Sequence, residues 1–184
     1  MREKIREAAL ELFDKYGFYH TGIRDIASKA ECSLPTLYYH YQSKELLFDK
    51  VVCDSFEQLS QSIDEQIPEG LPMMETFYYM VMQRRMLAPF EKLVFRIAIK
   101  VQLGFDGSEQ TQLRVKKWVD LFYTDTEKRL MEEFGNRIFS RLALRVLDQM
   151  LQRTALGEEE LTEADIEEEL KMFFSLRPDT VRPE

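Results

Sequence analysis

The sequence predicts an all-α protein in which an amino-terminal head of three helices precedes a helical bundle. Apolar residues recur at the helical spacing of three and four positions along most of the 184 residues. Glycine, proline and hydroxyl-bearing residues stand where these patterns start and stop, as helix breakers and caps do. Two short patterns near the amino terminus are followed by longer ones. We therefore expect a head at residues 1–47 and a larger helical domain at residues 48–184.

The first two helices are predicted by their apolar spacing. The first covers residues 2–17 and ends at Gly17, as a helix does at a carboxy-terminal glycine. Its inward stripe is expected to consist of Ile5, Ala8, Ala9, Leu12, Phe13 and Tyr16. Thr21 offers an N-cap oxygen to a short second helix that ends near Ala30.

The third helix begins at a proline. Ser33 is expected to cap it, with Leu34 in the first position and Pro35 in the second, where a missing amide N–H costs no helical bond. Ser43 is expected to cap a fourth helix, which runs to PEGLP at residues 68–72. The third helix must therefore be short.

A short helix, a three-residue turn and a second short helix, braced by a longer helix in front, form a helix-turn-helix. In that motif the second short helix lies in the major groove of DNA, where its exposed side chains meet base edges and phosphates. The residues equipped for this role are Thr36, Tyr38, Tyr39 and His40. Tyr41 is expected to face back into the core of the head.

The charge distribution agrees with a DNA-binding head. The net charge is −8, yet residues 1–52 hold eight Lys or Arg and eight Asp or Glu, so the acidic excess lies in the remainder. A neutral head can bind phosphates on one face, while an acidic remainder limits non-specific binding to DNA. Apolar runs fall short of the roughly 20 residues of a membrane span, and no signal peptide opens the chain. We expect a cytoplasmic protein.

The stretch AALELFDKYGFYHTGIRDIASKAECSLPTLYYHYQSKELL, from Ala8 to Leu47, resembles the DNA-binding head of the TetR family of bacterial transcriptional regulators. The resemblance implies that the second helix begins near a phosphate and that Lys44 contacts the DNA backbone. The DNA-binding residues it implies are Thr21, Arg24, Ser33, Leu34, Pro35, Thr36, Tyr38, Tyr39, His40 and Lys44.

The head departs from the family pattern at Glu31, where a glycine is usual. We expect Glu31 to adopt a left-handed backbone at a cost of about 1 kcal/mol. Leu34 can contact a thymine methyl group but cannot hydrogen-bond to a base. The sequence therefore does not identify the bases that the head recognises.

Five further helices are predicted after residue 72, at Met73–Met86, Glu91–Leu103, Glu109–Phe134, Arg137–Ala155 and from Thr162 to about Leu176. Residues 92–103 (KLVFRIAIKVQL) would also suit a strand. We predict a helix there because the flanking segments are helical. The last seven residues are expected to form a frayed tail.

The helix at residues 137–153 has an apolar arc wider than the roughly 100° that packing on one side requires. One side could face the core of its own subunit and the other a second copy across a two-fold axis. Burial inside one subunit is the alternative. The resemblance implies dimerisation through the last two helices. The expected interface consists of Phe139, Leu142, Val146, Met150, Ile166, Leu170 and Phe173.

The resemblance also implies that a small molecule bound in the helical domain moves the fourth helix and changes the distance between the two heads. Residues that could line its pocket, or could be ordinary core, are Tyr78, Tyr79, Met82, Phe95, Trp118 and Phe122. The ligand stays unidentified. The predicted function is that of a homodimeric repressor bound to a palindromic operator.

Other functions have less support in the sequence. The chain has no glycine-rich phosphate loop and no nucleophile motif, so we do not expect an enzyme, and no cofactor or metal is expected. The acidic runs at residues 158–160 and 167–169 are expected to be solvated surface. A thiol-based redox sensor on the same DNA-binding fold, using Cys32 or Cys53, is the alternative, because oxidation of Cys32 in the turn of the helix-turn-helix would disturb the head directly.

Overall fold

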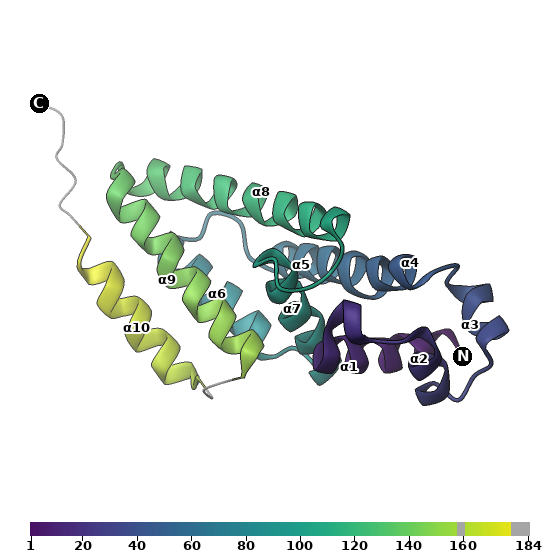
Figure 1. Ribbon diagram of the computed structural model, residues 1–184. Helices are drawn as coiled ribbons and strands as arrows, with labels where there is room; N and C mark the ends of the chain where they lie inside the picture. Colours follow the sequence, from purple (N-terminus) through teal and green to yellow (C-terminus); the bar gives the residue numbers. More distant parts are fainter. Residues whose placement is uncertain (158–160, 178–184) are drawn as a thin grey trace, which may run out of the picture. The chain divides into compact units, whose positions relative to one another are not determined.

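The computed structural model describes residues 1–157 and 161–177, and all regular structure in these ranges is helical (Figure 1). The all-α prediction is confirmed, including a helix over the ambiguous residues 92–103. The predicted acidic surface at residues 158–160 and the predicted tail lie outside the described residues, the tail from residue 178 on. None of the described helices is both long and apolar enough to cross a membrane. The helices are α1 (Arg2–His20), α2 (Ile23–Lys29), α3 (Leu34–His40), α4 (Lys44–Phe48), α5 (Ser55–Glu65), α6 (Met73–Arg85), α7 (Pro89–Gln102), α8 (Glu109–Phe134), α9 (Arg137–Leu156) and α10 (Glu163–Ser175), with a π-helical segment η1 (Asp49–Asp54).

The chain forms two compact units. The first unit contains residues 1–61 and 88–118, and the second contains residues 62–87 and 119–184. The first unit thus includes α7 and the start of α8 in addition to the head. The predicted division at residue 47 stays a prediction about where the DNA-binding head ends.

Aromatic side chains form the core of the head. The ring of Phe48 lies 4.8 Å from that of Phe13 and 5.1 Å from that of Phe18, in edge-to-face geometry. Such pairs contribute about 0.5–1.5 kcal/mol beyond the burial of their area. Leu37 of α3 is also fully buried, so α3 is held against the rest of the head by its apolar side.

The first helix is interrupted at its predicted end, Gly17, and then continues. Gly17 has φ 76° and ψ 169°, which interrupts α1, and the chain resumes one further turn to His20. A side chain at position 17 would be strained by this backbone, and its Cβ would lie 3.3 Å from the carboxylate of Asp106. The conformation therefore favours glycine, and a Cβ at this position would also require the Asp106 carboxylate to shift slightly.

Two of the three caps predicted in the head are confirmed. Ser33 and Ser43 accept hydrogen bonds from the backbone N–H groups of Thr36 and Leu46. Thr21 was expected to cap α2, and this prediction is wrong because Gly22 occupies the N-cap position. The Thr21 hydroxyl points back instead and bonds to carbonyl groups of α1.

The predicted fourth helix is interrupted by η1, which the sequence reasoning missed. Val51, Val52 and Cys53 are successive and all buried. A π-helical turn is wider than an α-helical turn, with backbone hydrogen bonds that span five residues. The helix then continues as α5.

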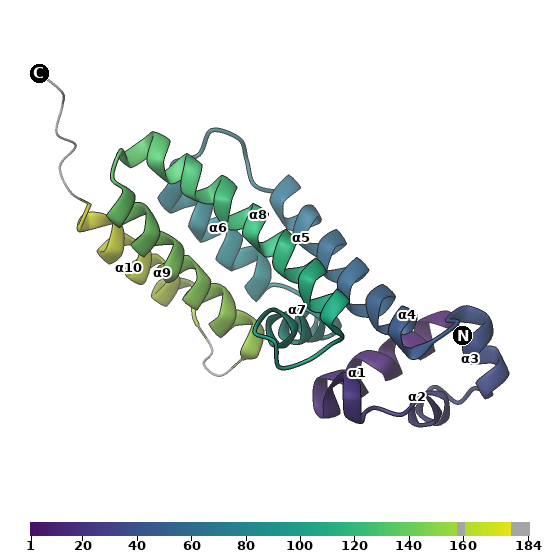
Figure 2. The same cartoon turned by 45° about the horizontal axis from the view of Figure 1, so that its top comes forward.

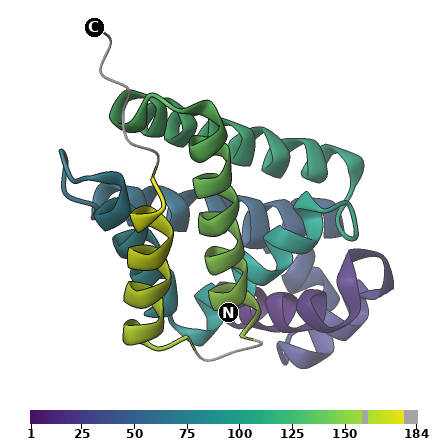
Figure 3. The same cartoon turned by 90° about the vertical axis from the view of Figure 1, so that its left-hand side faces the viewer.

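In the second unit, α6 packs against α9 and α10. Figure 3 shows α10, in yellow, beside α9. Asn136 caps α9, and Thr162 with Asp165 forms a reciprocal cap at the start of α10. The buried side chains of this core include Phe77, Leu130, Phe139, Leu147, Ile166 and Phe174.

Candidate nucleic-acid interface

The helix α3 has a buried side and an exposed side that differ in chemistry. Leu37 and Tyr41 point inward, which confirms the packing role predicted for Tyr41. Tyr38 and Tyr39 point outward, and Tyr39 is 85% exposed. His40 is half-buried, with its ring 5.3 Å from the Tyr39 ring. Phenol and imidazole groups therefore lie on the surface that a helix-turn-helix presents to DNA.

The amino-terminal turn of α3 is held by its own hydroxyl groups. The Ser33 hydroxyl accepts from the Thr36 N–H at 3.2 Å and lies 2.8 Å from the Thr36 hydroxyl. Leu34 is half-buried and Pro35 is exposed. The first turn thus presents Pro35 together with two hydroxyls that are already hydrogen-bonded to each other.

The turn between α2 and α3 confirms the expected strain at Glu31, whose φ is 53°. The Cys32 N–H donates to the Ala27 carbonyl at 2.9 Å, which closes this turn. The Glu31 carboxylate pairs with Lys4 at 3.2 Å. A non-glycine residue is therefore accommodated in the left-handed position.

Thr21 and Arg24, both expected at phosphate, have different surroundings. Thr21 is buried, and its hydroxyl donates to Gly17 at 2.7 Å, with the Leu12 carbonyl 3.1 Å away. Arg24 is exposed in the first turn of α2. In this geometry Arg24 is accessible to a phosphate, and the Thr21 hydroxyl is occupied inside the head. Their predicted roles at DNA stay predictions.

Lys44 has a structural role that the sequence reasoning missed. Its ammonium group donates to the Phe18 carbonyl at 2.9 Å and to the Thr21 carbonyl at 3.2 Å. The same group lies 4.5 Å from the centroid of the Phe18 ring. Lys44 therefore connects the start of α4 to the junction between α1 and α2, and its predicted contact with the DNA backbone stays a prediction.

The α7–α8 loop holds the same junction through a residue that the sequence reasoning also missed. The buried carboxylate of Asp106 accepts hydrogen bonds from the N–H groups of Phe18 at 2.6 Å and Gly107 at 2.8 Å. Lys100 of α7 donates to the Asp14 carbonyl at 2.7 Å. The carboxy-terminal part of α1 is thus held by residues almost ninety positions away in sequence. The only local signal was a turn-forming GFDG segment.

The residues predicted to line an effector pocket fall into both units. Phe95 and Trp118 belong to the first unit, where their rings pack on Phe56 at 5.5 and 5.0 Å. Met82 and Phe122 pack against the core of the second unit. Tyr79 is on the surface. Each unit is described by itself, so the common pocket stays a prediction.

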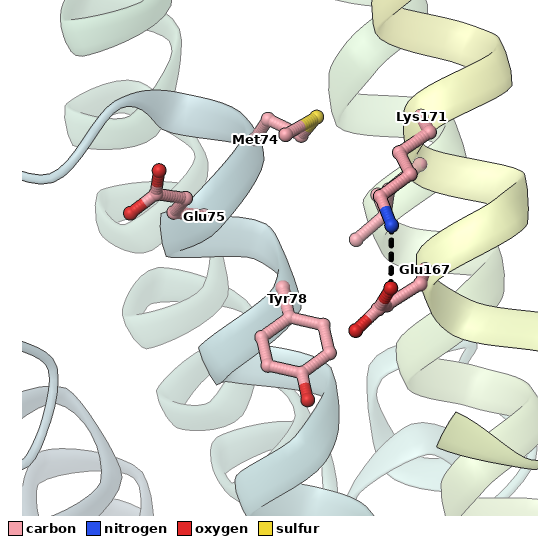
Figure 4. Close-up of a pocket in the computed structure, with 6 residues that line it drawn as sticks. Met74, Glu75, Tyr78, Glu167 and Lys171 are labelled. Carbon is pink, nitrogen blue, oxygen red and sulfur yellow. Dashed lines mark hydrogen bonds and ion pairs between the residues drawn. The ribbon is translucent and has the colours of Figure 1, made fainter. Parts of the chain in front are cut away.

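Tyr78 lines a cavity of about 210 Å³ between α6 and α10 of the second unit. Figure 4 shows Met74, Glu75 and Tyr78 on α6 and Glu167 and Lys171 on α10, with an ion pair between the last two. The Tyr78 hydroxyl donates to Glu163 at 2.7 Å, and this hydrogen bond raises the pKa of Tyr78 to about 12. The cavity can hold a small, largely apolar molecule.

A buried polar cluster in the second unit was not predicted. Burial lowers the pKa of Arg84 to about 10, against attraction from Asp64, Tyr123 and Asp148. The Tyr123 hydroxyl donates to Asp148, and burial together with this bond raises the pKa of Tyr123. Gln152 donates to the same carboxylate at 2.8 Å. The cluster joins α6, α8 and α9 by polar contacts.

The predicted dimer interface divides into buried and accessible residues. Phe139, Met150, Ile166 and Leu170 are buried within the second unit itself. Leu142 is 49% exposed, and Val146 and Phe173 are half-buried. The structure adds exposed apolar side chains that were not in the predicted interface, at Ile138, Met172 and Leu176. A partner can reach only the accessible set in this conformation.

The two cysteines differ in environment. Cys53 is fully buried, and burial raises the pKa of its thiol to about 12, with a further contribution from Asp49. Cys32 is half-buried in the turn before α3. Within residues 1–157 and 161–177, no group of three or more His, Cys, Asp or Glu side chains could hold a metal ion.

Known proteins resemble both the head and the whole chain. Residues 5–51 match the model for bacterial regulatory proteins of the tetR family. IcaR of Staphylococcus aureus strain Newman, a negative transcriptional regulator of the biofilm operon icaADBC, is 24% identical over 147 residues, which cover 75% of this chain and 78% of IcaR.

Solved structures share the fold. A TetR-like transcriptional regulator from Rhodococcus sp. RHA1 has a TM-score of 0.72 and 21% identity, over 94% of this chain and 92% of that chain. NalD of Pseudomonas aeruginosa, the secondary repressor of the MexAB-OprM efflux pump, has a TM-score of 0.65 and 17% identity, over 95% of this chain and 93% of that chain. At these identities the likeness shows the arrangement of the helices and nothing finer.

Proposed function

This chain belongs to the TetR family of bacterial regulatory proteins, and we propose that it is a homodimeric transcriptional repressor that binds a palindromic operator through α3. Like the IcaR regulator it resembles, it would prevent transcription when bound. The relatives are described as regulators, and we assign this chain no catalytic activity.

The observation that carries the proposal is the outer face of α3. Tyr38 and Tyr39 are exposed on a helix whose opposite side is buried through Leu37. Surface side chains such as these contribute little to the stability of the head. They can donate hydrogen bonds to phosphates and base edges, and their rings can contact sugars and thymine methyl groups.

Dimerisation is supported by the accessible apolar side chains of α9 and α10. Leu142, Val146 and Phe173 remain partly exposed after the second unit has formed its own core. A second copy could bury them across a two-fold axis. Two heads would then bind two half-sites about 34–36 Å apart, or a multiple of that distance.

Release by a small molecule is supported by the cavity between α6 and α10 and by the dependence of the head on the α7–α8 loop. A ligand shifts an equilibrium only by its difference in affinity for the two states, typically about 1–3 kcal/mol. Thermal shift measurements with a panel of small apolar compounds would test whether the second unit binds any of them. Absence of binding would remove this part of the proposal and leave DNA binding intact.

The decisive test is a gel shift of the purified protein on the DNA upstream of its own gene, with a salt series. Several phosphate contacts per dimer require the logarithm of the affinity to fall linearly with the logarithm of the salt concentration, with a slope of about −0.9 per contact. A scrambled duplex of the same composition should bind at least about a thousandfold more weakly. Equal affinity for both duplexes would contradict operator recognition.

A further inference from the structure

The structure shows what the Lys and Arg side chains of residues 1–52 contact. Four of the eight pair with carboxylates: Lys4 with Glu31 at 3.2 Å, Arg6 with Glu3 at 2.6 Å, Lys29 with Glu11 at 2.7 Å and Lys50 with Asp54 at 3.9 Å. Lys44 is bound to backbone carbonyls, and Lys15 lies 4.9 Å from the centroid of the Tyr16 ring. Six of the eight basic side chains thus have interaction partners within the protein.

Arg2 and Arg24 make no ion pair with any residue in the part of the chain that the structure describes. Both side chains are exposed. Because a phosphate need not displace a carboxylate from either one, these two guanidinium groups are the cations of the head most available to DNA.

The two arginines lie at different ends of the helix-turn-helix. Arg24 is in the first turn of α2. The Arg2 guanidinium lies 5.9 Å from the centroid of the Tyr41 ring, and Tyr41 is the residue that ends α3. Figures 1 and 2 both place the amino terminus of the chain beside α3. The recognition helix therefore has an available guanidinium close to its carboxy-terminal end.

We propose that Arg2 is a phosphate-binding residue, so that Arg2 and Arg24 contact the DNA backbone from two ends of the helix-turn-helix. The inference rests on the proposed function, because it takes α3 as the helix that enters the major groove. Contacts to phosphates fix the register of a protein on DNA without carrying sequence information. Arg2 would thus contribute affinity and orientation, while the exposed side chains of α3 contribute specificity.

The surroundings of Arg2 favour this role over that of an ordinary solvated side chain. The last carbonyl groups of α3 carry partial negative charge, which would repel a nearby phosphate, and a guanidinium at that end offsets the repulsion. The Tyr41 ring is buried and fixed, and its attraction for the cation restricts where Arg2 can point. A positioned side chain loses less conformational entropy when it binds.

The test compares the salt dependence of DNA binding of the full chain and of Arg2→Ala, with any purification tag placed at the carboxy terminus. The probes are the upstream duplex that the wild type binds and a random-sequence duplex of equal length. Loss of one phosphate contact per protomer reduces the slope by about 0.9 each, hence about 1.8 for a dimer. The ratio of wild-type affinity to Arg2→Ala affinity should therefore decrease about tenfold between 50 and 200 mM salt, on both duplexes.

Two further variants separate a phosphate contact from a packing effect. Arg2→Lys keeps the charge and should keep the wild-type slope. Arg6→Ala removes a base of the same helix that is already paired with Glu3, and it should leave the slope unchanged. An unchanged slope in Arg2→Ala overturns the inference, and so does an equal reduction in Arg6→Ala. A wild type that binds no DNA at all would instead contradict the proposed function.

Discussion

The helices α3 and α10 begin in the same way and expose different chemistry. Ser33 and Thr162 each accept a hydrogen bond from the backbone N–H three residues further on. The exposed side of α3 carries polar-tipped aromatic residues, whereas α10 exposes Met172, with Leu176 exposed at its C-cap. Tyrosine suits a partner rich in hydrogen-bonding groups, and methionine and leucine gain only from another apolar surface. The type of side chain exposed, more than the exposure itself, indicates the class of partner.

The largest effect is expected from the buried side of α3. Leu37→Ala should lower the free energy of unfolding by about 2–5 kcal/mol, because it leaves a cavity at a fully buried position. Urea denaturation followed by circular dichroism measures this loss. DNA binding should fall with it, since α3 would no longer be held in place. A stable Leu37→Ala protein would show that α3 does not depend on its packed side.

The second effect concerns the apolar surface of α9 and α10. Leu142→Asp should weaken dimerisation by at least about 2 kcal/mol, roughly thirtyfold, because it places a carboxylate in a desolvated contact. Sedimentation velocity over a concentration series measures the change. The matched control is Leu113→Asp, at an exposed leucine of α8 outside the predicted interface, which should leave dimerisation unchanged. A dimer unaffected by Leu142→Asp would place the interface elsewhere.

The third prediction compares two substitutions within the head, one at a cation that binds backbone carbonyls and one at an exposed aromatic residue. Lys44→Ala should lower the free energy of unfolding by about 1–2 kcal/mol, because two carbonyl groups lose a charged donor on a partly exposed side chain. Tyr39→Ala should change stability by no more than about 0.5 kcal/mol and weaken DNA binding about tenfold. Thermal unfolding and gel shifts on both variants give the comparison. If Lys44→Ala lost affinity with full stability, Lys44 would contact DNA directly, as the family resemblance implies.

Local patterns predicted most of the fold. Hydroxyl caps at Ser33, Ser43 and Thr162, and glycine at position 17, mark boundaries through bonds and angles within a few residues. The cap expected at Thr21 was wrong because its hydroxyl found acceptors in the preceding helix instead. The η1 segment was missed because the apolar spacing of residues 48–63 also fits a continuous α-helix, and no residue type marks a π turn.

The sequence predicted the surroundings of some site residues and missed those of others. The exposure of Tyr38 and Tyr39 and the burial of Tyr41 follow from helical spacing alone. The roles of Lys44 and Asp106 could not be predicted, since each bonds to backbone groups that only the folded chain brings near. Four predicted interface residues of α9 and α10 proved to be core, because an apolar arc does not say which of its sides faces inward.

The smallest effect is expected at Cys32, and it decides between a ligand-responsive and a thiol-based regulator. Cys32→Ser should change DNA affinity by less than about twofold. The turn is closed by the Cys32 backbone N–H, which serine retains. Cys53 is not expected to act in its place. Its pKa of about 12 leaves about one thiol in ten thousand ionised at pH 8, and alkylation requires the thiolate.

Iodoacetamide at pH 8 should therefore label the native protein at Cys32 alone, and both cysteines after unfolding, as intact-mass spectrometry would show. Because the pKa of Cys53 is raised, its labelling should increase only as the pH rises toward 12. Gel shifts of reduced and peroxide-treated protein complete the comparison. A large loss of affinity on oxidation that Cys32→Ser abolishes would establish the head, and not the cavity beside α10, as the part of the molecule that receives the signal.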